Sequence, residues 1–303
     1  MHVREFEVKD FNLKHTFESA QPITFCGDYD ERTNSLVYAE GVHIINVMHR
    51  QQKATSRSGR ITLASRDINY AERHFKEKFR ISDNLDRIYK KIDTDSFMHE
   101  SISKYRGMRL TVNDPWETTA LFIISQFNNV KRIRLIAKNM IDRFGAPIKD
   151  DMDSVVAKSF PTSAMLAQAT QAEIFACGTG FRDKYLKEAA DFCTYNINLD
   201  SLKSKSYSEI KDSLMEISGV GDKVADCIAL MGYGKTEACP IDVWMKRILE
   251  NVYFKGRKQR ISKLHEFAER RWGKYAGYAQ QYLFWNGRGS FTATVARRDD
   301  RKH

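Results

Sequence analysis

One lysine and one aspartate, nineteen residues apart, have types and positions that could do chemistry. Lys223 follows the run Gly219-Val220-Gly221, and Asp242 follows Pro240 and Ile241. In the first turn of a helix the positive end of the helix dipole disfavours an ammonium group and favours the neutral amine, which is a nucleophile. A carboxylate held nearby could stabilise positive charge that develops on a sugar ring, as in glycoside cleavage. The pair therefore indicates attack by a lysine on a carbonyl-like sugar carbon, through a Schiff base.

Two helices joined by a tight turn are expected to position the lysine. The segment from Tyr207 to Ile217 carries apolar residues at helical spacing, and a second segment of that kind starts directly after Gly221. The glycines between them allow a hairpin whose backbone amides can approach a phosphate closely. Asp242 precedes a third apolar helical segment and is expected to be its N-cap, which would hold the carboxylate in place.

Each of these residues also has an ordinary structural interpretation. A lysine in a first helical turn is more often a solvated charge or a phosphate contact, and Asp242 could be a cap only. Cys227 and Phe284, taken alone, are typical core residues, and Arg132 fits the polar face of an amphipathic helix. On the residues alone, both interpretations stay open.

The composition favours a nucleic-acid partner. The chain has 303 residues, with 49 lysines and arginines against 39 acidic residues, a net charge of +10 and a pI of about 9.3. Its five cysteines contain no C-x-x-C pair, which argues against an iron–sulfur cluster, and their low, odd number is typical of a reducing compartment. Without an apolar span of membrane length or a signal peptide, we expect a soluble intracellular protein of the cytoplasm, nucleoid or nucleus, with no membrane contact.

The order of the expected elements indicates an α+β protein. An N-terminal twisted antiparallel β-sheet domain, residues 1–108 with connecting helices, is expected to precede an all-helical region, residues 109–303, of one or two lobes. Asp114 and Pro115 provide a cap and a first-turn proline for a helix over 116–127, and everything after Gly145 is expected to be helical. The expected strands are 22–25, 35–38, 42–48 and 60–63, and the connecting helices are 70–79, 84–92 and 94–105.

The motifs carry a family resemblance. The runs Ile217-Ser-Gly-Val-Gly-Asp-Lys223-Val-Ala-Asp-Cys227 and Pro240-Ile-Asp242-Val resemble the helix-hairpin-helix and Pro/Asp loop of the 8-oxoguanine DNA glycosylases, in the helix-hairpin-helix Gly/Pro/Asp superfamily. A lone helix-hairpin-helix would be weak evidence, because many purely structural DNA-binding modules contain one. Four more stretches are similar to that family: Asp114-Pro115-Trp116, 127–133, 178–185 and 277–284.

The resemblance implies a bifunctional DNA glycosylase and AP lyase that flips 8-oxoguanine out of duplex DNA and excises it, in base excision repair. Lys223 would attack C1′ and expel the base, leaving an imine through which β-elimination nicks the strand 3′ to the lesion. Asp242 would stabilise the oxocarbenium-like transition state. The expected partner is double-stranded DNA containing oxidised guanine, and the enzyme is expected to work as a monomer without a cofactor or a metal.

A base pocket follows from the same resemblance. Cys227 and Phe284 would sandwich the flipped base, and Gln280 would hydrogen-bond its Watson–Crick edge. The carbonyl of Ala20 would accept the N7 hydrogen that only the oxidised base carries. The family has a glycine at this position, so we expect less secure discrimination of 8-oxoguanine from guanine, because alanine lacks the conformational freedom of glycine.

The DNA contacts implied by the family are only partly kept. Phe127 replaces the polar residue that fills the vacated hole in the stack, and Phe181 with Arg182 would form a second wedge. Trp244 stands where the family commonly has a histidine near the lesion's phosphate. We therefore expect weaker selectivity for the opposite base than for the lesion. The expected DNA-binding residues are Gly219, Val220, Gly221, Phe127, Asn128, Asn129, Arg132, Phe181, Arg182 and Trp244.

Two other functions stay open. The chain could be a non-catalytic helix-hairpin-helix protein that binds damaged or distorted DNA, or a glycosylase for another oxidised purine or an abasic site. A pure binder needs the hairpin glycines but has no use for Lys223 and Asp242, so these two side chains favour an enzyme.

Overall fold

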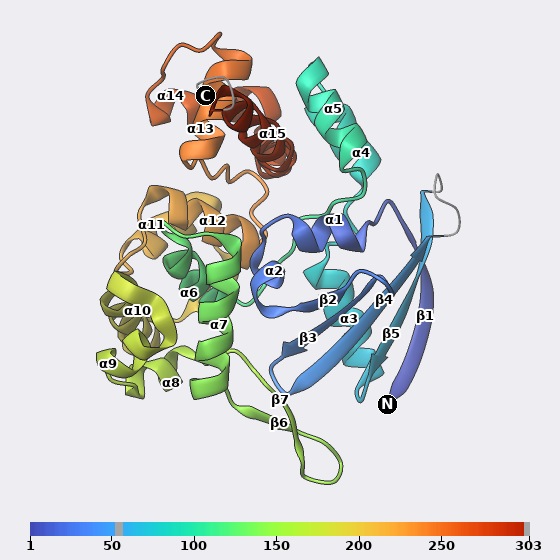
Figure 1. Cartoon of the computed structure of the whole chain (residues 1–303), viewed down its shortest axis with the longest axis vertical. Helices are drawn as coiled ribbons and strands as arrows, with labels where there is room; N and C mark the ends of the chain where they lie inside the picture. The colour runs from blue at the N-terminus through green and yellow to red at the C-terminus, as the bar shows by residue number, and fades with distance from the viewer. Residues whose placement is uncertain (52–56, 300–303) are drawn as a thin grey trace. The chain divides into compact units, whose positions relative to one another are not determined.

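The computed structural model, drawn in Figure 1, describes residues 1–51 and 57–299. The chain divides into two compact units. Unit 1 comprises Met1–Asp83 and Gly107–Gly234, and unit 2 comprises Asn84–Arg106 and Lys235–His303. The helical region thus contributes to both units. The boundary predicted after residue 108 separates the sheet domain from the helical region, whereas the two units are distinguished by their compactness. The predicted boundary therefore stays a prediction.

Unit 1 contains the expected antiparallel sheet, which confirms the predicted α+β class. The spatial order of its five strands is β1-β5-β4-β3-β2. Leu36, Ile45 and Leu63 are fully buried on three neighbouring strands and share a core with Phe75 of helix α3 (Ile68–Lys78), which packs on the sheet. The strands are β1 (His2–Lys9), β2 (Asp28–Asp30), β3 (Ser35–Glu40), β4 (His43–Gln51) and β5 (Ser58–Ser65).

The sheet differs from the prediction at two places. The segment predicted as a first strand, 22–25, forms the short helix α2 (Pro22–Cys26), preceded by α1 (Leu13–Glu18). Pro22 occupies the first helical position, where its missing N–H costs nothing, and this outweighs the strand preference of the residues after it. The strands β1 and β2 were not predicted. Most residues of β1 are exposed, so its apolar alternation is weak, and its pairing with β5 defines it instead.

Most of the remaining part of unit 1 is helical. Helix α6 (Pro115–Ser125) begins at the predicted cap, where the Asp114 carboxylate accepts a hydrogen bond from the Glu117 N–H at 2.8 Å. Nearly every residue of α6 is buried, so it forms the centre of this part of unit 1. It ends two residues before the predicted end, because Gln126 is already extended, with ψ 127°, and Phe127 is left-handed, with φ 48°. The other helices are α7 (Val130–Phe144), α8 (Ser163–Gln168), α9 (Gln171–Ile174), η1 (Phe175–Thr179), η2 (Gly180–Arg182), α10 (Asp183–Tyr195), η3 (Leu199–Ser204), α11 (Tyr207–Met215) and α12 (Asp222–Gly232).

The prediction that everything after Gly145 is helical is wrong. A two-stranded hairpin of β6 (Pro147–Lys149) and β7 (Val155–Lys158) projects from unit 1 after α7 (Figure 1). Asp150 shapes its turn by accepting hydrogen bonds from the Met152 and Ser154 amides, at 2.9 and 2.8 Å. Strands this short carry no readable periodicity, which explains the error.

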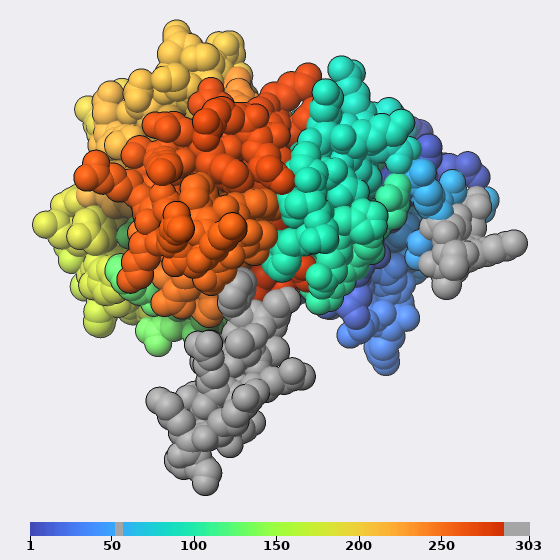
Figure 2. Space-filling view, turned by 90° about the horizontal axis from the view of Figure 1, so that it is seen from above, coloured from blue at the N-terminus to red at the C-terminus, as the bar shows by residue number. Residues whose placement is uncertain are grey.

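Unit 2 is helical and brings together two distant segments of the chain. Figure 2 shows the segment 84–106, in turquoise, lying against the C-terminal helices, in orange. Tyr89 and Tyr282 join them through a hydroxyl–hydroxyl hydrogen bond of 2.8 Å, and Arg271 pairs with Asp95 at 2.9 Å. The helices are α4 (Leu85–Ile92), α5 (Ser96–Lys104), α13 (Val243–Tyr253), α14 (Ile261–Trp272), η4 (Gly273–Tyr275) and α15 (Ala276–Asp299). Among the described residues, no helix combines the length and apolar character that crossing a membrane requires.

Candidate active site

The hairpin between α11 and α12 forms as predicted. Gly219 lies in its turn with φ 80°, a conformation that favours glycine, and a Cβ added there would approach the Tyr185 Cβ to 2.9 Å. Val220 is buried and its N–H donates to the Ile217 carbonyl at 3.0 Å, so the apolar middle residue anchors the turn. Gly221 is exposed, directly precedes α12, and a Cβ added to it would meet no atom within 4 Å. The turn therefore presents open backbone at a helix start, which suits an anion.

Lys223 occupies the predicted place in the first turn of α12. Its side chain is half-buried, and its Nζ lies 5.3 Å from the centroid of the Phe122 ring. None of the described carboxylates forms an ion pair with Lys223, because the two acidic residues of α12, Asp222 and Asp226, both pair with Lys211 at 2.8 Å. This role of Lys211 was not predicted, although its place on the preceding helix α11, facing α12, could have indicated it. The geometry leaves the Lys223 amine over an apolar ring, available to an incoming electrophile.

The same helix carries Cys227 one turn later. Cys227 is 4% exposed and lies four residues after Lys223, so both side chains emerge on one face of α12. All five cysteines lie in the described part of the chain and are in the thiol form. The structure thus brings together the predicted nucleophile and one predicted wall of the base pocket within unit 1.

Asp242 is the N-cap of α13 in unit 2, as predicted. Its Oδ1 accepts a hydrogen bond from the Met245 N–H at 2.7 Å, and the residue is half-buried. Trp244 follows in the first turn, where the guanidinium of Arg247 lies 5.5 Å from the centroid of its ring. The cap fixes the direction of the carboxylate, which is the property that an electrostatic role requires.

Helix α15 of unit 2 carries two more of the predicted pocket residues, Gln280 and Phe284. Gln280 is 6% exposed, and its Oε1 has no hydrogen-bond partner within the described residues. Phe284, one helical turn later, is half-buried. A buried amide oxygen without a partner is unfavourable unless something else donates to it, so Gln280 is suited to bind a ligand.

Ala20 has an unusual backbone conformation for an alanine. Its φ is 60°, so it adopts the left-handed conformation that a glycine would take without strain. Its neighbours hold it there: the Ser19 hydroxyl donates to the Thr16 carbonyl at 2.8 Å, and the Gln21 side chain both donates to the Arg109 carbonyl and accepts from the Thr111 amide. These hydrogen bonds hold Ala20 in the conformation that a glycine would adopt, and the less secure discrimination of 8-oxoguanine from guanine stays a prediction.

The loop after α6 places Phe127 outward. Phe127 is 95% exposed, and its ring centroid lies 6.4 Å from that of Phe181, which is 56% exposed. Asn128 donates from its side chain to the Ile124 carbonyl at 3.1 Å, and Asn129 caps α7 by accepting from the Arg132 N–H. These two asparagines shape the loop, while the exposed Arg132 has its guanidinium 3.3 Å from the Gly178 carbonyl.

Arg182, which was predicted to form a second wedge with Phe181, is buried. It is 5% exposed, and its guanidinium donates to backbone carbonyls of the loop after α6. Burial, followed by repulsion from Arg132, lowers the pKa of Arg182 from its ordinary value. The carbonyls come from a segment 55 residues away in the chain, so sequence patterns carry no signal for this burial.

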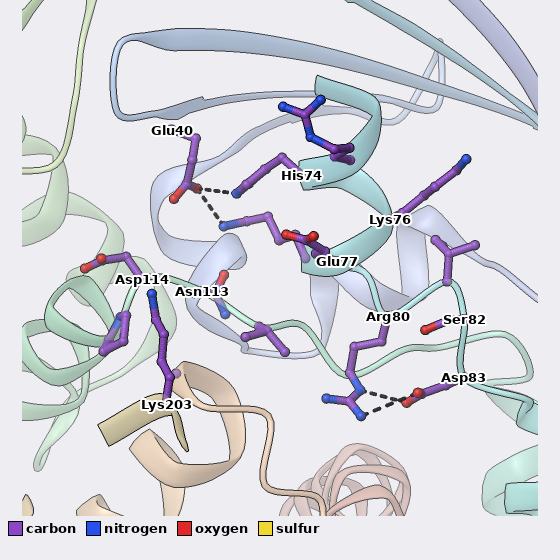
Figure 3. Close-up of a pocket in the computed structure, with 16 residues that line it drawn as sticks. Glu40, His74, Lys76, Glu77, Arg80, Ser82, Asp83, Asn113, Asp114 and Lys203 are labelled. Atoms are coloured by element: carbon purple, nitrogen blue, oxygen red, sulfur yellow. Dashed lines mark hydrogen bonds and ion pairs between the residues drawn. The ribbon is translucent and has the colours of Figure 1, made fainter. Parts of the chain in front are cut away.

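A cavity of about 920 Å³ in unit 1 is unrelated to these residues (Figure 3). Its wall carries the ion pairs Lys78–Glu40 at 3.0 Å and Arg80–Asp83 at 2.7 Å, and His74 lies 3.3 Å from Glu40. Burial opposes ionisation of Glu40, but Lys78 and His74 outweigh it and lower the pKa of Glu40 to about 2. No Phe, Tyr or Trp lines this cavity, and none of the predicted site residues does.

Two family models match the chain in succession. Residues 4–119 match the 8-oxoguanine DNA glycosylase N-terminal domain, and residues 120–274 match the HhH-GPD superfamily of base excision DNA repair proteins. The chain therefore belongs to the HhH-GPD superfamily, and within it to the branch that carries the 8-oxoguanine DNA glycosylase N-terminal domain. The family resemblance seen in the sequence is confirmed.

Individual relatives agree with this assignment. An N-glycosylase/DNA lyase of Saccharomyces cerevisiae is 31% identical over 245 residues, which cover 70% of this chain and 65% of the yeast protein. The protein MBOgg1, solved in complex with a low-affinity DNA ligand, is 32% identical with a TM-score of 0.83, covering 96% of this chain and 99% of that one. The Clostridium acetobutylicum 8-oxoguanine glycosylase/lyase, solved with DNA containing cytosine opposite 8-oxoguanine, is 26% identical with a TM-score of 0.83, covering 96% and 98%. The matched stretch spans less than two thirds of the yeast protein's length.

Proposed function

We propose that this protein is a bifunctional DNA glycosylase and AP lyase that removes 8-oxoguanine from duplex DNA in base excision repair. The observation that carries the proposal is Lys223, a half-buried lysine in the first turn of α12, directly behind an open glycine turn. Relatives with matching sequence are N-glycosylase/DNA lyases, and a structural neighbour is an 8-oxoguanine glycosylase/lyase. Where the genome is kept in a nucleus the protein would act there, and otherwise in the cytoplasm.

The chemistry follows from an amine nucleophile placed at a sugar carbon. The hairpin amides would hold a phosphate of the lesion strand while the damaged nucleotide leaves the stack. The Lys223 nitrogen would form a bond to C1′ as the glycosidic bond breaks, and the base would leave with the bonding electron pair and take up a proton. Opening of the sugar ring would give an imine, and removal of a C2′ proton would expel the 3′ phosphate by β-elimination.

Asp242 would act on the charge of the transition state. Positive charge develops on the sugar as the base leaves, and a carboxylate fixed as a helix cap needs no reorganisation to stabilise it. We propose that Asp242 combines both functions, since capping α13 determines where its oxygens point. Lys223 belongs to unit 1 and Asp242 to unit 2.

The lesion would be recognised by one backbone carbonyl and three side chains. Cys227 and Phe284 would stack on the two faces of the base, and the unpartnered Oε1 of Gln280 would accept a hydrogen bond from its edge. The carbonyl of Ala20, held in the left-handed conformation, would accept the N7 hydrogen of 8-oxoguanine. Guanine has no such hydrogen, which gives the site its discrimination.

The opposite strand would be held by an aromatic plug. Phe127 is 95% exposed and would fill the gap left by the flipped nucleotide, with Phe181 beside it. Arg132 would approach the orphaned base, and Trp244 would contact the lesion strand near Asp242. A plug of this kind fills space without reading hydrogen bonds, so we propose a relaxed preference for the opposite base.

A strand-cleavage assay tests the proposed function. Purified protein would be incubated with end-labelled duplexes that contain one 8-oxoguanine, another oxidised purine or an abasic site, each analysed with and without hot alkali. We expect cleavage of the 8-oxoguanine duplex without alkali. Cleavage only after alkali would indicate a glycosylase that uses water. Cleavage of the abasic duplex alone would show lyase activity without glycosylase activity. Binding without cleavage would favour a damage-binding protein.

A further inference from the structure

The buried guanidinium of Arg182 is bound by two successive carbonyls of the loop after α6 and by one carbonyl of its own segment, three residues earlier. Its Nε donates to the Gln126 carbonyl at 2.7 Å and its Nη2 to the Phe127 carbonyl at 3.1 Å, while Nη1 donates to the Thr179 carbonyl at 3.0 Å. One face of the guanidinium also lies 4.3 Å from the centroid of the Phe181 ring. At 5% exposure, the side chain has no free edge with which to read a DNA base.

The loop that Arg182 contacts is strained. Phe127 has φ 48°, a conformation that costs a bulky side chain free energy and persists only where surrounding contacts impose it. Its ring is 95% exposed, so hydrophobic burial of the ring cannot provide those contacts. The hydrogen bonds from Arg182 to the carbonyls on both sides of the Phe127 N–Cα bond are therefore the described contacts best placed to impose the conformation.

The loop is also tied to the phosphate-binding hairpin. The Gln126 side chain donates from Nε2 to the Gly219 carbonyl at 2.8 Å. Gly219 is the turn residue with φ 80° that precedes the open backbone at the start of α12. One arginine and one glutamine thus connect the exposed Phe127 ring to the turn in front of Lys223, all within unit 1.

We infer that Arg182 is a positioning residue that sets the Phe127 plug, and that Gln126 keeps this plug in register with the hairpin. This inference rests on the proposed function of Phe127 as the residue that fills the vacated stack. Arg182 would then contribute equally to the affinity for the lesion duplex whichever base lies opposite the lesion, because it acts through the backbone of the loop after α6. A direct reader would instead contribute only opposite the base to which it donates.

The test is Arg182→Lys, which keeps the charge and loses the planar fork. Dissociation constants for duplexes with 8-oxoguanine opposite C, A, G and T would be measured with the Arg182→Lys protein and with Arg143→Lys, a surface control whose arginine pairs with Glu173. Loss of charge-assisted hydrogen bonds should weaken binding about tenfold for all four duplexes, with single-turnover excision at saturating enzyme changed less than about threefold. The control should match the wild type. A loss confined to one opposite base would overturn the inference in favour of direct reading.

A double-mutant cycle separates the inference from the function on which it rests. If Arg182 acts through Phe127, Arg182→Lys should weaken binding by less than about twofold further in a Phe127→Ala background. Full additivity would overturn the positioning role. An unchanged affinity of Phe127→Ala alone would instead show that Phe127 does not fill the gap in the base stack, and would contradict that part of the proposed function. Gln126→Leu provides a second test if Arg182→Lys strongly lowers the melting temperature, because leucine cannot donate to the Gly219 carbonyl. This variant should reduce the unstacking of 2-aminopurine placed next to the lesion. Unstacking equal to that of the wild type would overturn the inference that Gln126 keeps Phe127 in register with the hairpin.

Discussion

Gly219→Ala should destabilise the protein by two separable effects. The residue has φ 80°, which costs an L-amino acid about 1–2 kcal/mol. The new Cβ would lie 2.9 Å from the Tyr185 Cβ and 3.2 Å from its Cγ, and such overpacking typically costs about 1–3 kcal/mol. Alanine also lowers the conformational entropy of the unfolded chain, which stabilises the folded protein by about 0.4–1 kcal/mol. The free energy of unfolding should therefore fall by about 3 kcal/mol.

Gly41→Ala is the matched control for this experiment. Gly41 also has a left-handed conformation, φ 55°, but no atom lies within 4 Å of its added Cβ. The free energy of unfolding of Gly41→Ala should fall only by the net cost of the left-handed conformation, about 1 kcal/mol. Both variants would be compared by urea unfolding followed by circular dichroism, with equal m-values as the check for a common unfolded state. Equal losses at Gly219 and Gly41 would refute the packing argument.

Three further predictions concern single side chains. Asp242→Asn should keep the cap on α13, and hence the melting temperature, while single-turnover excision falls about 100-fold or more; retained activity would leave Asp242 a cap only. Burial lowers the pKa of His49 to about 4, so between pH 6.5 and 4 the unfolded chain binds a proton that the folded chain does not. The free energy of unfolding should fall through that window as pH drops, by up to about 3 kcal/mol, and in His49→Leu this contribution should vanish from the melting temperature measured against pH. Ala20→Gly should raise the unfolding free energy by about 0.5–1 kcal/mol in urea titrations, since release of left-handed strain exceeds the added chain entropy, and a loss of stability would contradict the strain at φ 60°.

The sequence predicted the elements whose signals are local. The glycine turn before Lys223, the Asp242 cap and the Asp114-Pro115 helix start each depend on a few neighbouring residues, and all three are present. Strand β1 and the helix at Pro22 were missed, because pairing with β5 and a first-turn proline outweighed weak periodicity in these segments.

Long-range contacts carried no signal in the sequence. Burial of Arg182 depends on carbonyls 55 residues away, and the left-handed Ala20 depends on a glutamine side chain that bonds to residues 109 and 111. The roles of the site residues, as opposed to their places in the fold, stay proposals.

Borohydride trapping tests the central proposal most directly. Purified protein would be mixed with sodium borohydride and a duplex that carries a single 8-oxoguanine opposite cytosine, alongside Lys223→Gln and an undamaged duplex. We expect a covalent protein–DNA adduct with the lesion duplex that disappears in Lys223→Gln and is missing from the undamaged duplex. An adduct that persists without Lys223, or tight lesion binding with no adduct at all, would contradict the lysine Schiff base.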